Sequence, residues 1–437
     1  MRDETGSSAE APPDPGQGAD AKALGLVAVS VVGSGVFTYA YLALVARGLP
    51  TADYGWFGSY WSLALVIGFG AFLPVELELA RLVSARPPGA RFPAGTARTL
   101  LTLTVACLVL VALLGGVLTS SLGGQVGFLW ALLAVCVVSA GQFLLRGWML
   151  GTGRLRLHGI VLLVDSGLRV LLALVLGWSV DDASGSDYAW TLVLAISLAH
   201  LPLLLWTTRG RTAARHEDAP VEPARPFVTA VGHLLVGSLC AQALLNAAPV
   251  LITVLAAPGE EALAAQFIAS YTLVRLPLFV AVPLQSALVP VLVNLGTSGD
   301  GSRLRTFLLR GLAVIGVLAV LAAAVGLWLG PPIVELVFGA RYALPGGEIA
   351  LLAVGSVLHL GLLVAGQALV AAGRHRQVAV VWALGLVTAA VLFAVVDDLV
   401  LRASLAFTVG SGVALAIAAV TLLVRPRDPA GTAPHAA

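Results

Sequence analysis

The sequence predicts an all-α polytopic membrane protein with about 12 transmembrane helices in two six-helix lobes. Of its 437 residues, 59% are hydrophobic and only 11% are charged, whereas a soluble globular chain carries about 25% charged residues. Apolar runs of roughly 20 residues recur along the chain, and each is long enough to cross a hydrocarbon core of about 30 Å. The runs lack the polar and apolar alternation of a membrane β-barrel, so helices are expected.

The apolar runs place the predicted spans and divide the chain. The longest hydrophilic connection, 207–227, is expected as a cytoplasmic linker between an N-terminal lobe at 23–206 and a C-terminal lobe at 228–424. Residues 1–22 are expected to form a disordered cytoplasmic tail because they cannot build an apolar core, and 425–437 a second cytoplasmic tail. The predicted spans are 24–46, 56–80, 97–118, 126–149, 157–178, 188–206, 228–256, 264–294, 306–329, 347–371, 376–396 and 402–424.

Basic residues alternate between successive connections. One set of connections carries only Arg47, Arg341 and Arg402. Because basic residues stay on the cytoplasmic side of a membrane, this alternation predicts an even number of spans in the cytoplasmic (inner) membrane, with both termini inside. The richer, cytoplasmic set consists of Arg81, Arg86, Arg91, Arg98, Arg146, Arg154, Arg156, Arg209, Arg211, Arg215, Arg225, Arg303, Arg305, Arg310, Arg374 and Arg376, with Arg2, Lys22, Arg425 and Arg427 in the tails.

The two halves resemble each other at equivalent spans. Gly153–Arg156 follows the fourth span as Gly373–Arg376 follows the tenth, and Phe57–Tyr60 opens the second span as Ile268–Tyr271 opens the eighth. Coincidence within a small residue alphabet is the alternative. A parallel repeat of six spans predicts a cavity between two lobes, which is the architecture of an alternating-access carrier.

Several function classes are disfavoured. The sequence has no phosphate-binding Gly-rich loop ending in Lys and no metal-ligand cluster, so neither a cofactor nor a metal is expected, and a net charge of +2 gives no reason to expect nucleic acid. The cysteines lie in apolar runs as small hydrophobic residues. External connections are short, so an enzyme with an external platform is not expected and no catalytic residue is assigned.

Ala46–Gly55, Gly330–Tyr342 and the segment from Arg146 to Arg154 resemble motifs of the polysaccharide flippases, a family within the multidrug/oligosaccharidyl-lipid/polysaccharide exporter superfamily. Ala46–Gly55 is similar to the link between the first two spans of that family, and Gly330–Tyr342 is similar to its segment after the ninth span. Arg146-Gly147, followed by Gly151 and Gly153-Arg154, resembles its connection after the fourth span. The loop typical of the major facilitator fold is missing from 81–98.

The resemblance implies a carrier that flips a polyprenyl-diphosphate-linked oligosaccharide from the inner to the outer leaflet for surface polysaccharide synthesis. Its implied partners are membrane lipid, the lipid-linked glycan and glycosyltransferases or a polymerase of the same pathway. Two alternatives remain open. One is a cation-coupled small-molecule (multidrug) exporter, and the other is a non-transporting scaffold of a glycan assembly complex.

Arg275 is the leading candidate for contact with substrate. It lies near mid-depth of the predicted span 264–294 with no acidic residue three or four positions away, and a charge within a span is costly enough to suggest a function. The segment from Arg275 to Pro290 resembles the eighth span of the lipid II flippases, which implies an arginine lining the cavity. A guanidinium suits a diphosphate because it donates in a fork. The alternative is a structural arginine bonded to carbonyls of a proline-broken helix.

Other polar residues within spans complete the prediction. Arg47, Asn246 and Gln285 join Arg275 as expected substrate contacts. Glu76, Asp165 and Arg169 are candidates for the coupling ion, although Asp165 and Arg169 lie four residues apart and a neutralised structural pair is the alternative. The histidines near or within spans, His200, His233 and His359, are expected to be satisfied core residues.

Overall fold

The computed structural model describes residues 15–86, 92–212, 225–278, 301–372 and 374–424, and every regular element within them is a helix. The predicted all-α class is therefore confirmed. The N-terminal half contributes α1 (Pro15–Gly48), α2 (Thr51–Leu65), the π-helix η1 (Val66–Phe72), α3 (Leu73–Ser84), α4 (Thr96–Leu113), α5 (Gly115–Ser121), α6 (Val126–Gly151), α7 (Leu155–Ser179) and α8 (Gly185–Thr212). The C-terminal half contributes α9 (Arg225–Leu255), α10 (Glu261–Val274), α12 (Gly301–Trp328), α13 (Gly330–Phe338), η2 (Ala340–Tyr342), α14 (Gly346–Ala371), α15 (His375–Val395) and α16 (Leu399–Leu423).

Eleven helical segments of the described residues are long and apolar enough to cross a membrane, with mean hydropathy between 1.7 and 2.6. They coincide with eleven of the predicted spans, and α2, η1 and α3 together form one of them, Thr51–Ser84. The remaining predicted span, 264–294, is described only as α10 and the turn that follows it, because 279–300 lie outside the described residues.

The outer surface of the helices is apolar. In the most hydrophobic stretch of α12 no residue is buried inside the protein, and Trp178 at the end of α7 is 90% exposed. Soluble monomers rarely expose so much apolar surface, so this surface indicates contact with lipid tails. The structure therefore supports a multi-pass membrane protein.

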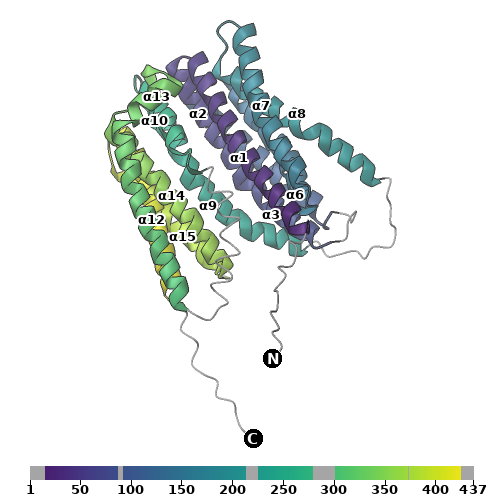
Figure 1. Cartoon of the computed structure of the whole chain (residues 1–437). Coiled ribbons are helices and arrows are strands. Elements are labelled where there is room, and N and C mark those ends of the chain that lie inside the picture. Colours follow the sequence, from purple (N-terminus) through teal and green to yellow (C-terminus); the bar gives the residue numbers. More distant parts are fainter. Residues whose placement is uncertain (1–14, 87–91, 213–224, 279–300, 373, 425–437) are drawn as a thin grey trace, which may run out of the picture.

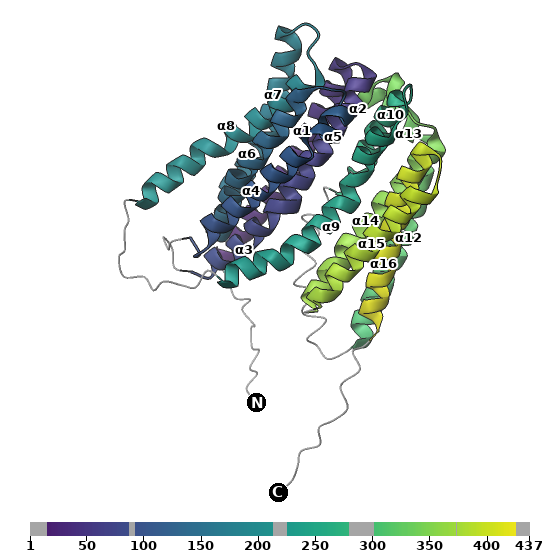
Figure 2. The ribbon, with the colours of Figure 1, turned by 180° about the vertical axis from the view of Figure 1, so that it is seen from behind.

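The described helices form two lobes. In the N-terminal lobe α1 packs on α7 and α6 packs on α3 and α8, while in the C-terminal lobe α14 packs on α12 and α16, and α15 on α16. Helix α9 contacts both lobes, since it packs against α2 and η1 on one side and against α15 and α16 on the other. In both views the bundles meet where α10 and α13 approach α2 and diverge toward the opposite end (Figures 1 and 2).

Several helices differ from the predicted spans in where they begin, end or break. The π-helix η1 interrupts the second span just before Pro74, whose missing N–H removes one bond of the α-helical ladder. The third span, predicted at 97–118, breaks at Leu114, where two glycines follow and weaken the helix. Helices α8 and α9 enter the predicted linker 207–227 at both ends, and α1 begins at Pro15, inside the predicted tail.

Candidate functional site

Arg275 follows Val274, the last residue of α10, and caps that helix at the boundary between the lobes. The backbone N–H groups of Arg275 and Leu276 bond to carbonyls three residues back, as in a tightened last turn. Pro277 prevents the α-helix from continuing because it has no N–H to donate and disfavours helical geometry in the residue before it. Helix C-termini favour positive charge, so a guanidinium is well placed at this break.

Arg275 contacts a neutral polar group and an aromatic ring. Its Nη2 donates to Oδ1 of Asn246 on α9 at 3.2 Å, and its guanidinium lies 5.0 Å from the centre of the Tyr271 ring. Asn246 is fully buried and its Nδ2 donates to Oε1 of Gln242 at 2.9 Å, which turns the asparagine oxygen toward the arginine. Across the lobe boundary, the Tyr39 hydroxyl of α1 donates to the Thr272 carbonyl at 2.8 Å.

Within the described part of the chain, no carboxylate forms an ion pair with Arg275. A guanidinium carries five N–H donors, and among the described residues the Asn246 oxygen takes one of them. Within that part of the chain, this half-buried cation has donors left for an anion. The predicted contacts Arg275 and Asn246 are thus brought together. Gln285 lies outside the described residues.

Arg47 lies away from Arg275, at the end of α1 predicted to be external. Its Nη2 donates to the Leu336 carbonyl at 2.5 Å and its Nε to the Val337 carbonyl at 3.1 Å, which are among the last carbonyls of α13 in the C-terminal lobe. Such terminal carbonyls have no partner within their own helix and carry the negative end of its dipole. Arg47 therefore joins the two lobes, and its predicted contact with substrate remains a prediction.

An arginine of the C-terminal lobe makes the reciprocal contact with the end of α1 in the N-terminal lobe. Nη2 of Arg341 donates to the Ala46 and Leu49 carbonyls at 3.1 and 2.8 Å, where α1 ends. We call the contacts of Arg47 and Arg341 the arginine clasp. Beside it the ring of Tyr54 lies 5.1 Å from that of Tyr342, and both rings are buried. The clasp and this aromatic contact close the lobes together on one face.

Glu76 is paired with a residue that sequence spacing could not identify. Its Oε2 lies 3.0 Å from Nε of Arg146 on α6, and the guanidinium of Arg146 lies 5.0 Å from the Phe143 ring centre. Assigning Arg146 to a cytoplasmic connection was wrong, because it lies within α6 with its side chain mostly buried. The local sequence around Glu76 offers no partner because Arg146 follows 70 residues later.

Asp165 and Arg169 form an ion pair along α7, as their spacing of four residues permits, and Arg169 lies 5.7 Å from the Trp61 ring centre. His200 of α8 is buried within electrostatic reach of both. One of its ring nitrogens, Nδ1, lies 3.0 Å from the Ile196 carbonyl, while Nε2 is buried with no protein partner among the described residues. His200 is therefore only half satisfied, whereas Nδ1 of His359 lies 3.1 Å from the Ser411 hydroxyl.

No group of metal-ligating residues occurs in the described ranges. The candidate site therefore consists of two polar regions. One is the cation Arg275 with its neutral partners at the lobe boundary, and the other is the pair of buried carboxylates, Glu76 and Asp165, each balanced by an arginine within the N-terminal lobe.

This chain shares its fold with proteins of known structure. No family model matches the sequence. An uncharacterized protein of Mycobacterium tuberculosis and one of Mycobacterium bovis are each 28% identical over 359 residues, which is 79% of this chain and of each relative. Among solved structures, the DinF-BH multidrug transporter in complex with R6G gives a TM-score of 0.65 at 15% identity, covering 95% of this chain and 98% of that one.

Two further structures carry the same fold. An inward-facing multidrug resistance MATE transporter of the MOP superfamily gives a TM-score of 0.62 at 16% identity, covering 91% of this chain and 96% of its own. A MOP superfamily transporter from Pyrococcus furiosus, described as having a binding pocket of reverse polarity, gives 0.59 at 16% identity over 92% and 94% of the two chains. The predicted two lobes of six helices are confirmed, and the fold of this chain is that of the MOP-superfamily transporters.

Proposed function

We propose that this chain is a membrane carrier that exports an amphipathic substrate by alternating access. The observation that carries the proposal is the arginine clasp. Arg47 and Arg341 join the lobes at one membrane face, while the lobes diverge toward the other face (Figure 1). An alternating-access carrier needs two lobes that close on one face at a time around a shared site, and Arg275 lies at the boundary of these lobes.

Two substrate classes fit this carrier, and different observations support them. Export of small organic molecules is the candidate that the comparisons favour, since two of the similar structures are of multidrug transporters. Such export needs an energy source, and the carboxylates of Glu76 and Asp165, with Arg169 beside the latter, are our candidates for coupling it to a cation.

Export of an anionic glycolipid is the second candidate, and Arg275 supports it. A half-buried guanidinium without a carboxylate partner among the described residues repels cationic drugs and suits a diphosphate. The motifs at Ala46–Gly55 and Gly330–Tyr342 add the likeness to polysaccharide flippases. In that case the cargo is a polyprenyl-diphosphate-linked oligosaccharide, and glycosyltransferases of the cytoplasmic membrane are the expected partners.

Reconstitution into liposomes separates the candidates. The purified chain is tested for rhodamine 6G transport driven by a proton or sodium gradient, and in parallel for flipping of a fluorescent polyprenyl-diphosphate sugar, detected by quenching with an impermeant reductant. Gradient-driven rhodamine transport without glycolipid flipping supports the drug exporter, and the reverse supports the flippase. Failure of both in protein that remains folded would favour the non-transporting scaffold and contradict the carrier.

A further inference from the structure

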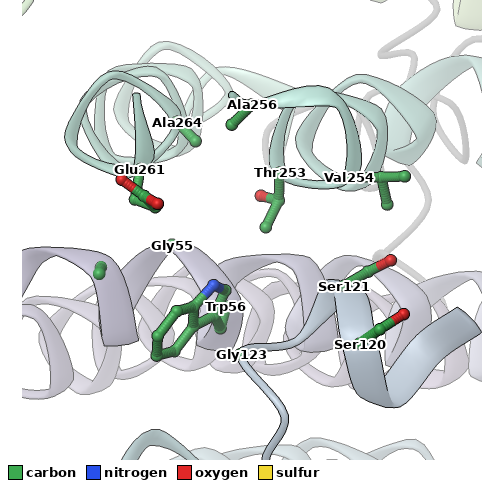
Figure 3. A pocket seen from close by; sticks show the side chains of 11 residues that line it. Gly55, Trp56, Ser120, Ser121, Gly123, Thr253, Val254, Ala256, Glu261 and Ala264 are labelled. Carbon is green, nitrogen blue, oxygen red and sulfur yellow. The ribbon is translucent and has the colours of Figure 1, made fainter. Parts of the chain in front are cut away.

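A pocket lies apart from Arg275, on the face of the protein that the arginine clasp closes. It has a volume of about 310 Å³, near the lower end of the range for small-molecule sites. One wall carries Trp56 of α2 with Ser120 and Ser121 of α5, and the other carries Thr253 of α9 and Glu261 of α10 (Figure 3). Because the walls belong to different lobes, the pocket exists only while the lobes are together on this face.

The Trp56 indole packs closely against the backbone at Gly123. Gly123 has φ +68°, and a Cβ atom at this position would meet three indole atoms at 2.4 to 2.6 Å. Only a glycine lets the backbone lie so close to the ring. The Trp56 side chain is partly buried, and its indole N–H has no hydrogen-bond partner among the described residues. Trp56 therefore offers a preorganised apolar surface and a free donor.

The remaining polar groups of the pocket are mainly acceptors. The Ser120 hydroxyl donates to the Val117 carbonyl at 2.9 Å, so its oxygen lone pairs are left for a ligand. Oε2 of Glu261 accepts the Gly259 N–H at 2.9 Å, and its other oxygen has no partner among the described residues. None of the described residues that line the pocket is basic, so an anion is disfavoured.

We infer that this pocket is a binding site for an uncharged sugar. A sugar places C–H groups on an aromatic surface and O–H donors on carboxylate and hydroxyl oxygens, which is the combination that Trp56, Glu261 and Ser120 offer. A quaternary ammonium ion would use the ring and the carboxylate but has no donor for the hydroxyl oxygens. The inference goes beyond the proposed function, because this site is separate from the Arg275 region. It does not depend on which substrate the carrier exports.

Binding of neutral disaccharides to the full chain in nanodiscs tests the inference. Lactose, maltose and cellobiose serve as probes in calorimetric titrations, with tetramethylammonium chloride and inorganic phosphate as charged comparisons. We expect at least one disaccharide to bind, with affinity reduced about tenfold or more in Trp56→Ala and reduced also in Glu261→Gln. Glu261→Gln keeps the side-chain size and an oxygen for the Gly259 N–H, so it tests the carboxylate itself.

Two variants control for the introduced changes. Glu260→Gln alters the neighbouring carboxylate, which accepts the Ala257 N–H outside the pocket, and Trp178→Ala removes an exposed indole on α7. Both should bind the disaccharide as the unmodified chain does. The inference is wrong if no disaccharide binds, if Trp56→Ala binds as well as the unmodified chain, or if tetramethylammonium is the only probe that depends on Glu261.

A transport measurement identifies where the sugar comes from. If the site takes a free sugar, adding the disaccharide outside liposomes should slow transport by the unmodified chain but not by Trp56→Ala. If it takes the glycan of the cargo, Trp56→Ala should itself slow glycolipid flipping, and added disaccharide should have little effect. Disaccharide binding is measured without transport, so a failure of the carrier proposal would leave this test intact.

Discussion

Arg47 and Arg341 cross the lobe boundary in opposite directions, and each donates to the carbonyls that end a helix of the other lobe. Arg47 reaches the Leu336 and Val337 carbonyls of α13, and Arg341 reaches the Ala46 and Leu49 carbonyls where α1 ends. A contact to a helix end depends on that end being close, so neither arginine keeps its partners once the lobes separate. The clasp is thus specific to one conformation of the carrier.

Removing either clasp arginine should shift the carrier toward a state open on the clasped face. Ala265, which is fully buried opposite Gly55, is replaced by cysteine in a background without Cys107, Cys136 and Cys240, and labelling by an impermeant thiol reagent is timed. Charge-assisted hydrogen bonds contribute about 1.5–3 kcal/mol when buried, and these are partly exposed, so we expect labelling to be roughly tenfold faster in Arg341→Ala.

Arg402 provides the matched control for the clasp. It also lies in a connection predicted to be external, but its guanidinium packs on Phe393 of its own lobe. Arg402→Ala should leave the labelling rate of the introduced cysteine unchanged. Equal labelling rates of the introduced cysteine with and without Arg341→Ala would mean that the clasp does not hold the lobes together.

Removing the Glu76 carboxylate should destabilise the N-terminal lobe. Glu76→Gln leaves Arg146 as a buried charge without its partner, and breaking a buried pair costs about 3–5 kcal/mol. Glu78→Gln is the comparison, because Glu78 is buried to a similar degree but its partner Arg81 is 66% exposed. Water can therefore solvate the arginine that is left, and pairs that solvent reaches contribute less, down to about 0.2–1 kcal/mol when fully exposed. Thermal unfolding in detergent should give a clearly lower Tm for Glu76→Gln than for Glu78→Gln.

The double variant Glu76→Leu, Arg146→Met separates a structural role from ion coupling. Replacing both charges with apolar side chains removes the unpaired charge, so stability should return. If Glu76 couples export to a cation, this folded variant should fail to transport against a gradient. Full gradient-driven transport by the double variant would remove Glu76 from the coupling candidates.

How far the sequence could predict the fold depended on whether the signal was local. Spans such as 126–149 are strongly apolar despite single polar residues, so hydropathy alone located α6. The pair Asp165 and Arg169 was equally predictable from its spacing. In contrast, Glu76 and Arg146 lie 70 residues apart, and no local pattern connects them.

The sequence predicted only those parts of the candidate site that have a local signal. Arg275 and Asn246 stand out because polar groups within spans are costly, and the structure brings them into contact. The clasp could not be predicted, since Arg47 and Arg341 bind backbone carbonyls, which every residue carries. The pocket at Trp56 depends on the close approach of Gly123 to the indole. These residues lie far apart in the sequence, so only the tertiary structure shows their contact.

Opposite labelling of two cysteines should test the predicted topology. Thr152 ends α6 in a connection rich in arginine, and Asp181 follows α7 in an acidic connection. Because basic connections stay inside, Asp181→Cys should react with an impermeant thiol reagent in intact cells, and Thr152→Cys should react only after permeabilisation. Labelling of both in intact cells would contradict the twelve-span arrangement.

Arg275→Ala should weaken the binding of an anionic substrate while leaving the fold intact. Hydrogen bonds to charged groups contribute about 1.5–3 kcal/mol each, so loss of the guanidinium should weaken binding of a polyprenyl-diphosphate sugar by roughly 10- to 100-fold. Arg275→Lys keeps the charge but loses the fork, and should retain intermediate affinity. Asn246→Leu controls for the network, since it removes the neutral partner but keeps the cation free to meet the anion.

If Arg275 instead serves only the fold, Arg275→Ala should lower membrane abundance, and the protein that remains should transport normally per molecule. Measuring abundance and flipping in the same liposome preparations separates these outcomes. Improved rhodamine 6G transport in Arg275→Ala would point to an exporter of cations, in which this arginine repels the substrate.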